Sequence, residues 1–321
     1  MSKAEAIALL VILIMTGLVI GNLIFQAIVE RRNPPIGRFV QCDGIRLHYI
    51  DRGDSRAPCV VLLHGNGTMI QDLTISGLVD LLAQHSRVIC FDRPGFGHSP
   101  RPRSRLWTPS AQAELLIIAL NQLGVRDPVV FGHSWGTLVA LALALRKDYP
   151  IRGLVLASGY YFPTARLDFW MMSGPAIPVV GDLLRYTIAP LISWAMLPSL
   201  FRKLFAPKAV PAVFQSEFPK SMTLRPKQLR AAAEESALLI PSTAKLRSQY
   251  PAIDCSVHIF HGKADEVIEF DQSQRLSGKI PQSALDLVPG AGHMVTHQDV
   301  TQIGTAIEAM LGNAPGNATY A

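Results

Sequence analysis

The segment that most constrains this 321-residue chain is an apolar run that leads directly into Gly132-His133-Ser134-Trp135-Gly136. Val129–Phe131 favours a buried strand, and Leu138–Arg146 favours a helix. A turn this tight between a strand and a helix leaves no room for side chains at its two glycines, Gly132 and Gly136. The chain is therefore predicted to expose Ser134 at the carboxyl end of a strand, next to a helix N-terminus.

Six other apolar runs of strand length accompany Pro128–Gly132. They are Ile45–Asp51, Cys59–His64, Arg87–Phe91, Ile151–Ala157, Val257–Gly262 and Ser283–Val288. Helical periodicity lies between several of them, at Gln71–Gln84, Thr108–Gly124, Trp135–Lys147 and Asp271–Lys279. Short apolar strands that alternate with helices predict an α/β fold, in which helices cover both faces of a mostly parallel sheet.

A second constraint is the uncharged stretch Ala6–Val29, which is 24 residues long. A helix of that length spans about 36 Å, enough to cross the ~30 Å hydrocarbon layer with some tilt. A cleaved signal peptide would have a shorter apolar core and a small-residue cleavage site, which Phe25–Val29 does not offer. Because Asn33-Pro34-Pro35 cannot continue a helix, we predict one transmembrane helix and a linker within residues 1–35.

The alternation of strands and helices stops between Gly159 and Tyr250. These 92 residues hold 10 of the 23 prolines, with apolar helical pieces at Leu183–Met196 and Leu200–Phe205. We therefore predict that residues 159–250 form a helical insertion. It would divide a core made of residues 36–158 and 251–312, and residues 313–321 would form a flexible tail.

The composition argues against several other classes of protein. Hydrophobic residues make up 49% of the chain and charged residues 17%, which is too apolar for a disordered protein. The net charge is +6, without a basic run or zinc-finger spacing, so nucleic-acid binding is not expected. The four cysteines form no Cys-x-x-Cys pair. Neither a disulfide framework nor a metal site is therefore predicted.

A serine hydroxyl becomes a strong nucleophile only when a base removes its proton and an acid orients that base. Asp265 and His293 each follow a predicted strand by a few residues, on the side where active sites of open α/β sheets assemble. The chain order Ser134, Asp265, His293 is that of nucleophile-elbow hydrolases. We predict these three residues to be a catalytic triad. Glu266 is an alternative acid, and His297, expected on the first turn of the last helix, is an alternative base.

Acyl transfer through a serine also needs two N–H donors aimed at the developing oxyanion. The turn places the Trp135 amide as the first donor. We predict Asn66, in the loop His64-Gly65-Asn66-Gly67, to supply the second amide. Gly65 and Gly67 let this backbone approach a substrate closely. His64 is assigned to holding the loop and not to proton transfer.

Taken together, five segments resemble the α/β-hydrolase superfamily, in its branch with a helical cap. They are His64–Gly67, Asp92–Ser99, Gly132–Gly136, His261–Asp265 and Gly290–His293. The resemblance covers about Gly37–Gly312. It implies the α/β-hydrolase fold, a Ser-His-Asp triad that needs no metal or organic cofactor, and a cap formed by residues 159–250. It also implies a structural role for Asp92–Ser99, as a turn beside the active site.

Two details depart from related families. Asn66 and Trp135 look like the halide-binding pair of haloalkane dehalogenases, but those enzymes and the epoxide hydrolases use an aspartate nucleophile where this chain has Ser134. The sequence Gly-His-Ser-Trp-Gly-Thr is also similar to that of proline iminopeptidases, whose His-Gly-Gly-Pro-Gly-type loop is absent here. A serine at this position favours the transfer of an acyl group to water.

The insertion is rich in large apolar side chains, which favour a substrate with an apolar acyl or alkyl part. They are Trp170, Met171, Met172, Leu183, Leu184, Trp194, Met196, Leu197, Phe201 and Phe205. We therefore expect a membrane-anchored esterase or lipase that cleaves a lipophilic carboxylic ester, such as an acylglycerol, through an acyl-enzyme. Haloperoxidase-like or perhydrolase activity, iminopeptidase activity and non-catalytic binding are the alternatives. The sequence leaves the oligomeric state open.

Basic residues near the apolar stretch predict its orientation. Lys3 precedes it, and three arginines follow within about a dozen residues: Arg31, Arg32 and Arg38. The positive-inside rule then places the hydrolase domain in the cytoplasm, as part of a single-pass membrane protein. The insertion carries 11 basic and 5 acidic residues. Arg202, Lys203 and Lys208 flank Leu204-Phe205, so this surface is expected to rest on anionic lipid headgroups.

Overall fold

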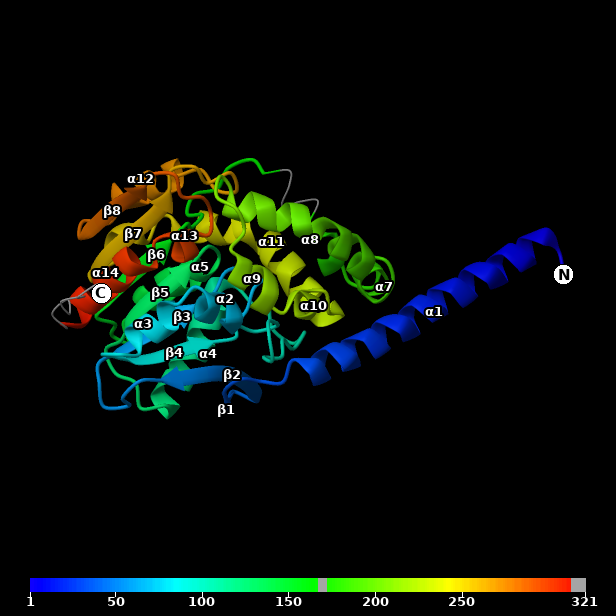
Figure 1. The fold of residues 1–321 in the computed structure, drawn as a ribbon, viewed down its shortest axis with the longest axis horizontal. Coiled ribbons are helices and arrows are strands. Elements are labelled where there is room, and N and C mark those ends of the chain that lie inside the picture. The colour runs from blue at the N-terminus through cyan, green and yellow to red at the C-terminus, as the bar shows by residue number, and fades with distance from the viewer. Residues whose placement is uncertain (167–171, 313–321) are drawn as a thin grey trace.

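The computed structural model describes residues 1–166 and 172–312. Its strands are β1 (Arg38–Cys42), β2 (Ile45–Arg52), β3 (Cys59–Leu63), β4 (Arg87–Phe91), β5 (Val129–His133), β6 (Gly153–Ala157), β7 (Ser256–Gly262) and β8 (Ser283–Val288). They form one eight-stranded sheet in the order β1-β2-β4-β3-β5-β6-β7-β8 (Figure 1). The pairs β1–β2 and β2–β4 are antiparallel and the other five are parallel. The prediction of a mostly parallel sheet is thus confirmed.

Strand β1 is missing from the set predicted from sequence. It pairs with β2 across the two-residue turn Asp43-Gly44, so that Cys42 lies opposite Ile45. Both turn residues have positive φ, 48° and 73°. An Asp-Gly pair in two left-handed positions is a preferred turn of tight β-hairpins. This turn was therefore the signal in the sequence that could have identified β1.

Helices cover both faces of the sheet, as its fully buried central strands require (Figure 1). One face carries α4 (Pro109–Gln122), α5 (Gly136–Ala144) and α12 (Asp271–Ser277). The other carries α2 (Ile70–Ile75), α3 (Leu78–Leu82) and α14 (Val300–Leu311), with the short helix α13 (Val295–Gln298) before it. These two layers hold the strand ends, and therefore the loops that follow them, in fixed positions.

Two predicted helices differ from those in the structure. The prediction of one helix over Gln71–Gln84 is wrong, because Gly77 lies between α2 and α3 with a φ of +83°. A left-handed glycine ends the helical hydrogen-bond pattern. The predicted helix Trp135–Lys147 is too long, because α5 ends at Ala144.

Between β6 and β7 the chain forms the helical insertion. Its elements are η1 (Gly174–Ala176), α7 (Val180–Tyr186), α8 (Ala189–Phe205), α9 (Ala212–Glu217), α10 (Lys220–Thr223), α11 (Pro226–Leu246) and η2 (Tyr250–Ala252). The predicted boundaries Leu183–Met196 and Leu200–Phe205 are wrong. The break falls at Thr187, and α8 continues through Pro198. Trp170, Met171 and the predicted tail 313–321 lie outside the described residues.

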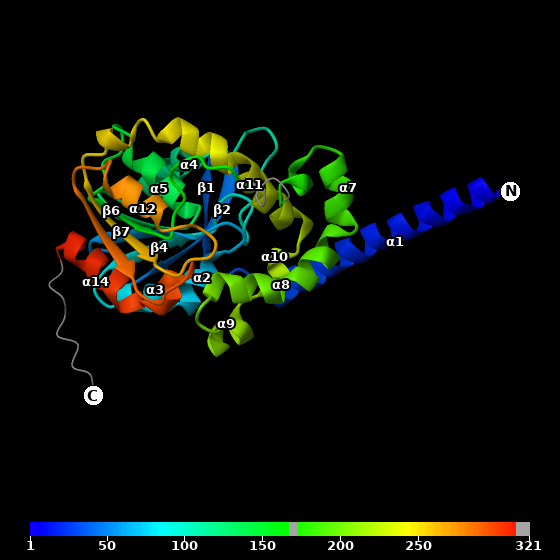
Figure 2. The ribbon, with the colours of Figure 1, turned by 90° about the horizontal axis from the view of Figure 1, so that it is seen from above.

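The N-terminal helix α1 (Lys3–Arg32) projects away from the body of the molecule (Figures 1 and 2). It begins at a capping box formed by Ser2 and Glu5 and ends at Asn33. Within the described part of the chain, α1 is the one helix that is long and apolar enough to cross a membrane.

The C-terminal half of α1 packs against the insertion. The Asn22 side-chain amide donates hydrogen bonds to the carbonyl oxygens of Tyr186, at 2.8 Å, and Thr187, at 3.0 Å. Nearer the end of α1, Glu30 forms an ion pair of 3.0 Å with Arg225. The helix is therefore joined to the insertion by polar contacts at two levels.

Candidate active site

Ser134 lies on a strained turn between β5 and α5. Its φ is +51°, in the left-handed region that residues other than glycine rarely adopt. A Cβ atom at Gly132 would lie 2.7 Å from the Gly136 carbonyl oxygen, and one at Gly136 would lie 2.5 Å from the Leu63 carbonyl oxygen. Neither glycine leaves room for a side chain, so the close packing of β3, β5 and α5 fixes the serine at the carboxyl end of β5.

The side chains of Ser134, His293 and Asp265 form a continuous hydrogen-bonded chain. His293 Nε2 lies 3.0 Å from Ser134 Oγ, and His293 Nδ1 lies 2.8 Å from Asp265 Oδ2. An ionised carboxylate can only accept hydrogen bonds, so Nδ1 carries the proton and Nε2 is left to accept from the serine. The structure thus brings together the three residues selected from the sequence, from loops that follow β5, β7 and β8.

Several donors surround the Asp265 carboxylate. Its Oδ1 accepts from the backbone N–H groups of Val267 and Ile268, at 2.8 and 2.9 Å. His261 Nε2 lies 3.2 Å from Oδ2. Burial raises the pKa of this carboxyl, but the charge on His293 and the hydrogen bonds from His261 and His293 outweigh burial and hold the pKa well below its usual range. Asp265 therefore stays ionised and can orient the imidazole of His293.

The two alternative residues, Glu266 and His297, are not part of the hydrogen-bonded chain of Ser134, His293 and Asp265. Glu266 is exposed to solvent, whereas the carboxylate of Asp265 is buried. The predicted position of His297, on the first turn of the last helix, is wrong, because it lies in the separate helix α13. Its Nε2 is 2.8 Å from Asp72 Oδ1, so this histidine has a different partner.

The loop after β3 lies directly against the serine. A Cβ atom at Gly65 would be 3.1 Å from Ser134 Cβ. The side-chain amide of Asn66 donates to the Ala232 carbonyl in α11 at 3.1 Å, so it is already engaged. The donor that remains to Asn66 is therefore its backbone N–H.

A buried ion pair joins the loop after β4 to α11, and no local pattern in the sequence indicates it. Arg93 pairs with Glu235, and both side chains are fully buried. Arg93 also donates to the carbonyl oxygens of His64 and Gly65, at 2.8 and 2.9 Å. Trp135 Nε1 donates to the Glu235 carbonyl at 3.1 Å. Helix α11 is therefore fixed to the two backbone segments next to Ser134, which are the loop after β3 and the start of α5.

His64 makes the contacts of a residue that holds the loop. Its Nε2 accepts from the backbone N–H of Arg93 at 3.0 Å, so Nδ1 carries the proton and donates to the Gly65 carbonyl at 2.8 Å. Burial, followed by the charge of Arg93, lowers the pKa of His64 to about 3. The ring is therefore neutral, and both nitrogens are engaged.

A second histidine and carboxylate, absent from the sequence prediction, support the base from behind. His133 Nε2 donates to the His293 carbonyl at 3.0 Å, which leaves Nδ1 without a proton when the ring is neutral. This Nδ1 faces Asp72 Oδ2 at 4.0 Å, and neither atom has a hydrogen-bond partner among the described residues. Burial, with the charge of His293, lowers the pKa of His133 to about 4. His133 therefore stays neutral and holds the backbone of His293.

An apolar cluster borders the site on the side of the insertion. Met294, which follows His293 in the chain, is buried in it. The other buried members are Val29, Met69, Phe205, Phe214, Phe218 and Met222. They come from α1, the loop after β3, α8, α9, the residue that follows α9, and α10, so apolar side chains of the insertion pack around Met294, next to the base.

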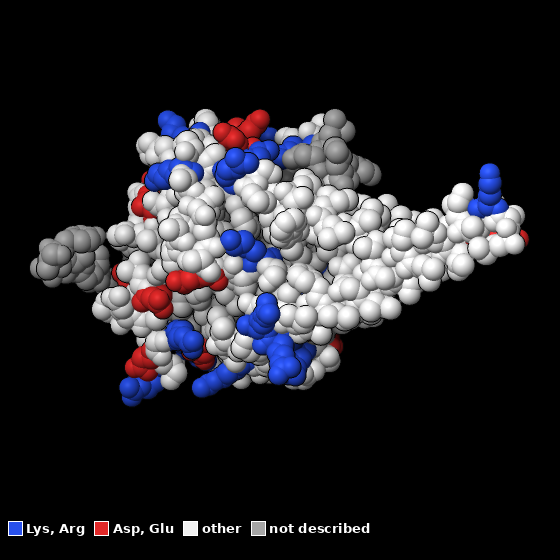
Figure 3. Space-filling view, turned by 45° about the vertical axis from the view of Figure 1, so that its right-hand side comes forward, with Lys and Arg blue, Asp and Glu red and all other residues white. Residues whose placement is uncertain are grey.

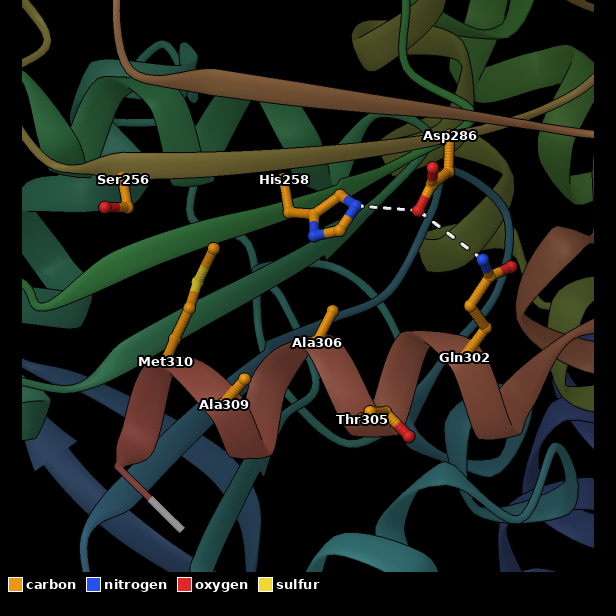
Figure 4. A pocket seen from close by; sticks show the side chains of 8 residues that line it. All are labelled: Ser256, His258, Asp286, Gln302, Thr305, Ala306, Ala309 and Met310. Carbon is orange, nitrogen blue, oxygen red and sulfur yellow. Dashed lines mark hydrogen bonds and ion pairs between the residues drawn. The ribbon is translucent and has the colours of Figure 1, made fainter. Parts of the chain in front are cut away.

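A cavity of about 600 Å³ lies elsewhere, between α14 and the strands β7 and β8 (Figure 4). His258 Nε2 forms a 2.8 Å contact with Asp286 Oδ2, and Gln302 lies beside them (Figure 4). His258 is near the start of β7, whereas Asp265 follows its carboxyl end. None of Ser134, His293 and Asp265 lines this cavity. It therefore lies apart from the candidate active site.

Comparisons with known proteins support a hydrolase fold. The model of the alpha/beta hydrolase family matches residues 60–303. The 2-hydroxymuconate semialdehyde hydrolase of Pseudomonas putida is 25% identical over 287 residues, which cover 88% of this chain and 97% of that protein.

Two solved structures extend this likeness at the level of the fold. An esterase from Exiguobacterium antarcticum superposes with a TM-score of 0.67 at 20% identity, covering 87% of this chain and 100% of the esterase. A membrane phospholipase A, described as a bacterial virulence factor, superposes with a TM-score of 0.64 at 20% identity. The superposition covers 97% of this chain and 96% of the phospholipase chain.

Proposed function

Because this chain belongs to the alpha/beta hydrolase family, we propose that it is a membrane-anchored serine hydrolase that cleaves lipophilic carboxylic esters. The observation that carries the proposal is the hydrogen-bonded chain Ser134–His293–Asp265 on a strained turn. In this proposal the three residues are the catalytic triad, and the backbone N–H groups of Asn66 and Trp135 form the oxyanion hole.

The geometry supports a two-step reaction. Ser134 Oγ attacks the acyl carbon of the ester while His293 Nε2 takes the hydroxyl proton, and the carboxylate of Asp265 stabilises the resulting imidazolium. The two N–H groups stabilise the oxyanion. His293 returns the proton to the leaving alcohol, which leaves an acyl-enzyme on Ser134. A water molecule, deprotonated by His293, then releases the carboxylic acid and restores the serine.

The preference for a lipophilic substrate rests on the apolar cluster around Met294. Uncharged side chains beside the base favour an acyl chain over a charged group. Likeness to an esterase and to a membrane phospholipase A is consistent with this choice.

The first test is the hydrolysis of p-nitrophenyl esters by the purified full-length protein. Ser134→Ala and His293→Ala should each lower kcat/KM by about 10³-fold or more, and the double variant should lose little beyond either single one, because a triad acts as a unit. Ser158→Ala is the matched control. Ser158 is a fully buried serine after the neighbouring strand β6, and its hydroxyl has no hydrogen-bond partner among the described residues. Unchanged turnover in Ser134→Ala would reject the triad.

A series of acyl chains tests the substrate class. We expect kcat/KM to rise from acetyl to about octanoyl, because each buried CH₂ contributes up to ~0.8 kcal/mol. A second candidate is cleavage of a compound like 2-hydroxymuconate semialdehyde, which the Pseudomonas putida relative favours. A maximum at acetyl, together with turnover of that compound, would select this candidate. Peroxide-dependent oxidation would instead indicate a perhydrolase, and release of N-terminal proline an iminopeptidase.

We further propose that α1 crosses the membrane once and that the hydrolase domain faces the cytoplasm. The support is the length and apolar character of α1 and the arginines Arg31 and Arg32 in its last turn. Proteolysis of intact cells should leave the hydrolase domain uncut, and permeabilised cells should lose it. Cleavage from the outside of intact cells would reverse the orientation.

A further inference from the structure

Large apolar side chains gather on one exposed part of the insertion. Outside residues 1–32, the described chain exposes 15 large hydrophobic side chains, and 12 of them belong to residues 172–213. On α7 and α8 these include Leu183 (56% exposed), Leu191 (57%) and Trp194 (69%). A soluble surface rarely collects so much apolar area in one place, and such a patch marks an interaction site.

This exposed face continues directly onto α1. Both ribbon views show α7 beside α1, and the space-filling view shows an uncharged surface that runs from α1 onto the body (Figures 1, 2 and 3). A groove of about 360 Å³ lies between α1 and α8. It is lined mainly by Gly17, Gly21, Phe25, Pro190, Leu191 and Trp194.

The length of α1 sets the depth of the groove. Only the uncharged residues 6–16 precede Gly17, and 11 helical residues span about 16 Å, roughly half of the ~30 Å hydrocarbon layer. A helix α1 that crosses the whole layer must therefore include its Gly17–Phe25 segment in the hydrocarbon. Since α8 packs beside that segment, α8 must lie at the same depth.

The chemistry of α8 suits this position. Residues 187–201 carry no charge, and exposed Arg202 and Lys203 follow immediately, where they can reach the headgroups. The carbonyl groups at the end of α7 would lack partners in lipid, but Asn22 donates to those of Tyr186 and Thr187.

We infer that the outer face of α7 and α8 is embedded in the same bilayer as α1, and that a lipid acyl chain fills the groove between α1 and α8. This inference rests on the proposed membrane span, but not on the catalytic role of Ser134. The sequence alone predicts that the insertion rests on the lipid headgroups. In this inference the insertion enters the hydrocarbon, and only its basic end, at Arg202 and Lys203, lies at the level of the headgroups.

The test uses the full-length protein reconstituted into vesicles of phosphatidylcholine, with or without bromine on the acyl chains. Bromine quenches tryptophan fluorescence on contact, so a lipid-exposed Trp194 should be quenched. The background is Trp170→Phe, because residue 170 lies outside the described part of the chain. Trp194→Phe should remove at least half of the quenching, whereas Trp107→Phe should remove none, because Trp107 is 1% exposed.

Two results would overturn the inference. Equal quenching with and without Trp194, in protein that floats with the vesicles, would show that α1 is inserted while α8 is not. Failure of the protein to float with the vesicles would contradict both the membrane span and the embedded face. Turnover of a soluble ester by the same preparation tests the triad separately, so failure of the proposed hydrolase activity remains distinguishable from failure of the membrane contact.

Discussion

The two sides of the helical insertion, α11 on one and α7 with α8 on the other, differ in the contacts that they make. Helix α11 is fixed to the core by polar contacts, above all the fully buried pair Arg93–Glu235. Helices α7 and α8 turn apolar side chains outward, among them Trp194. Breaking a buried ion pair strongly destabilises the fold, whereas apolar contacts with lipid can rearrange. The difference indicates that α11 is the side of the insertion fixed to the core, whereas α7 and α8 form the side that is open to its surroundings.

The largest effect should come from removing the buried carboxylate. Glu235→Ala leaves Arg93 buried without its partner, and should lower the free energy of unfolding by about 3–5 kcal/mol. Thermal or denaturant unfolding in detergent measures this. Glu217→Ala, at an exposed position of α9, should stay within about 0.5 kcal/mol of the wild type. Equal effects of the two substitutions would show that α11 is not fixed by this pair.

Acidic pH should lower the stability that depends on the buried histidines His64 and His133. It should leave the exposed apolar face of α7 and α8 unchanged. Burial lowers the pKa of His64 to about 3 and that of His133 to about 4, from an ordinary value of 6.5. Between pH 6.5 and about 4 the unfolded chain binds protons that the folded chain does not, so stability falls as pH falls. Each histidine contributes up to roughly 1.4 kcal/mol per pH unit.

We therefore expect the free energy of unfolding in detergent to drop by about 2–4 kcal/mol between pH 7.5 and pH 5. His133→Asn should make this slope shallower by about 1 kcal/mol per pH unit. The emission of Trp194 in vesicles should not change over the same range. A flat stability profile would contradict buried, neutral histidines beneath the site.

A smaller effect is expected where α1 meets α7. Asn22→Ala removes the hydrogen bonds to Tyr186 and Thr187 and should cost about 1 kcal/mol, as measured by unfolding in detergent. Thr16→Ala, one turn or more before this contact, is the control and should change stability by less than about 0.5 kcal/mol. No difference between the two variants would mean that the hydrogen bonds of Asn22 do not hold α1 against α7.

The smallest effect on stability should come from the exposed face itself. Trp194→Ala should change the free energy of unfolding in detergent by less than about 0.5 kcal/mol, since Trp194 is 69% exposed. Trp107→Ala, at a position 1% exposed, should cost about 3–5 kcal/mol. A large loss in Trp194→Ala would show that α8 is part of the folded core and not a lipid-facing surface.

What could be predicted from the sequence depended on local pattern. The turn at Ser134 and the chain order of Asp265 and His293 are visible in short stretches, because each follows an apolar strand. Strand β1 had a local signal too, the Asp43-Gly44 turn, but its strand is short and only partly apolar.

The pair Arg93–Glu235 had no such signal. The two residues are 142 positions apart, and only the docking of α11 brings them together. The same holds for Asp72, whose neighbours His133 and His297 come from β5 and α13, far away in the sequence. At the break between α7 and α8, the Thr187 carbonyl likewise accepts a hydrogen bond from Asn22 of α1, 165 positions away. Tertiary contact, more than local propensity, decided these features.

Covalent labelling of Ser134 tests the central claim most directly. The full-length protein is treated with a fluorophosphonate, which reacts with activated serines, and the modified peptide is identified by mass spectrometry. The account predicts one adduct, on Ser134, that is absent in Ser134→Ala and forms at least about 100-fold more slowly in His293→Ala, because the base no longer removes the proton. An adduct on another serine, or undiminished labelling of Ser134→Ala, would contradict it.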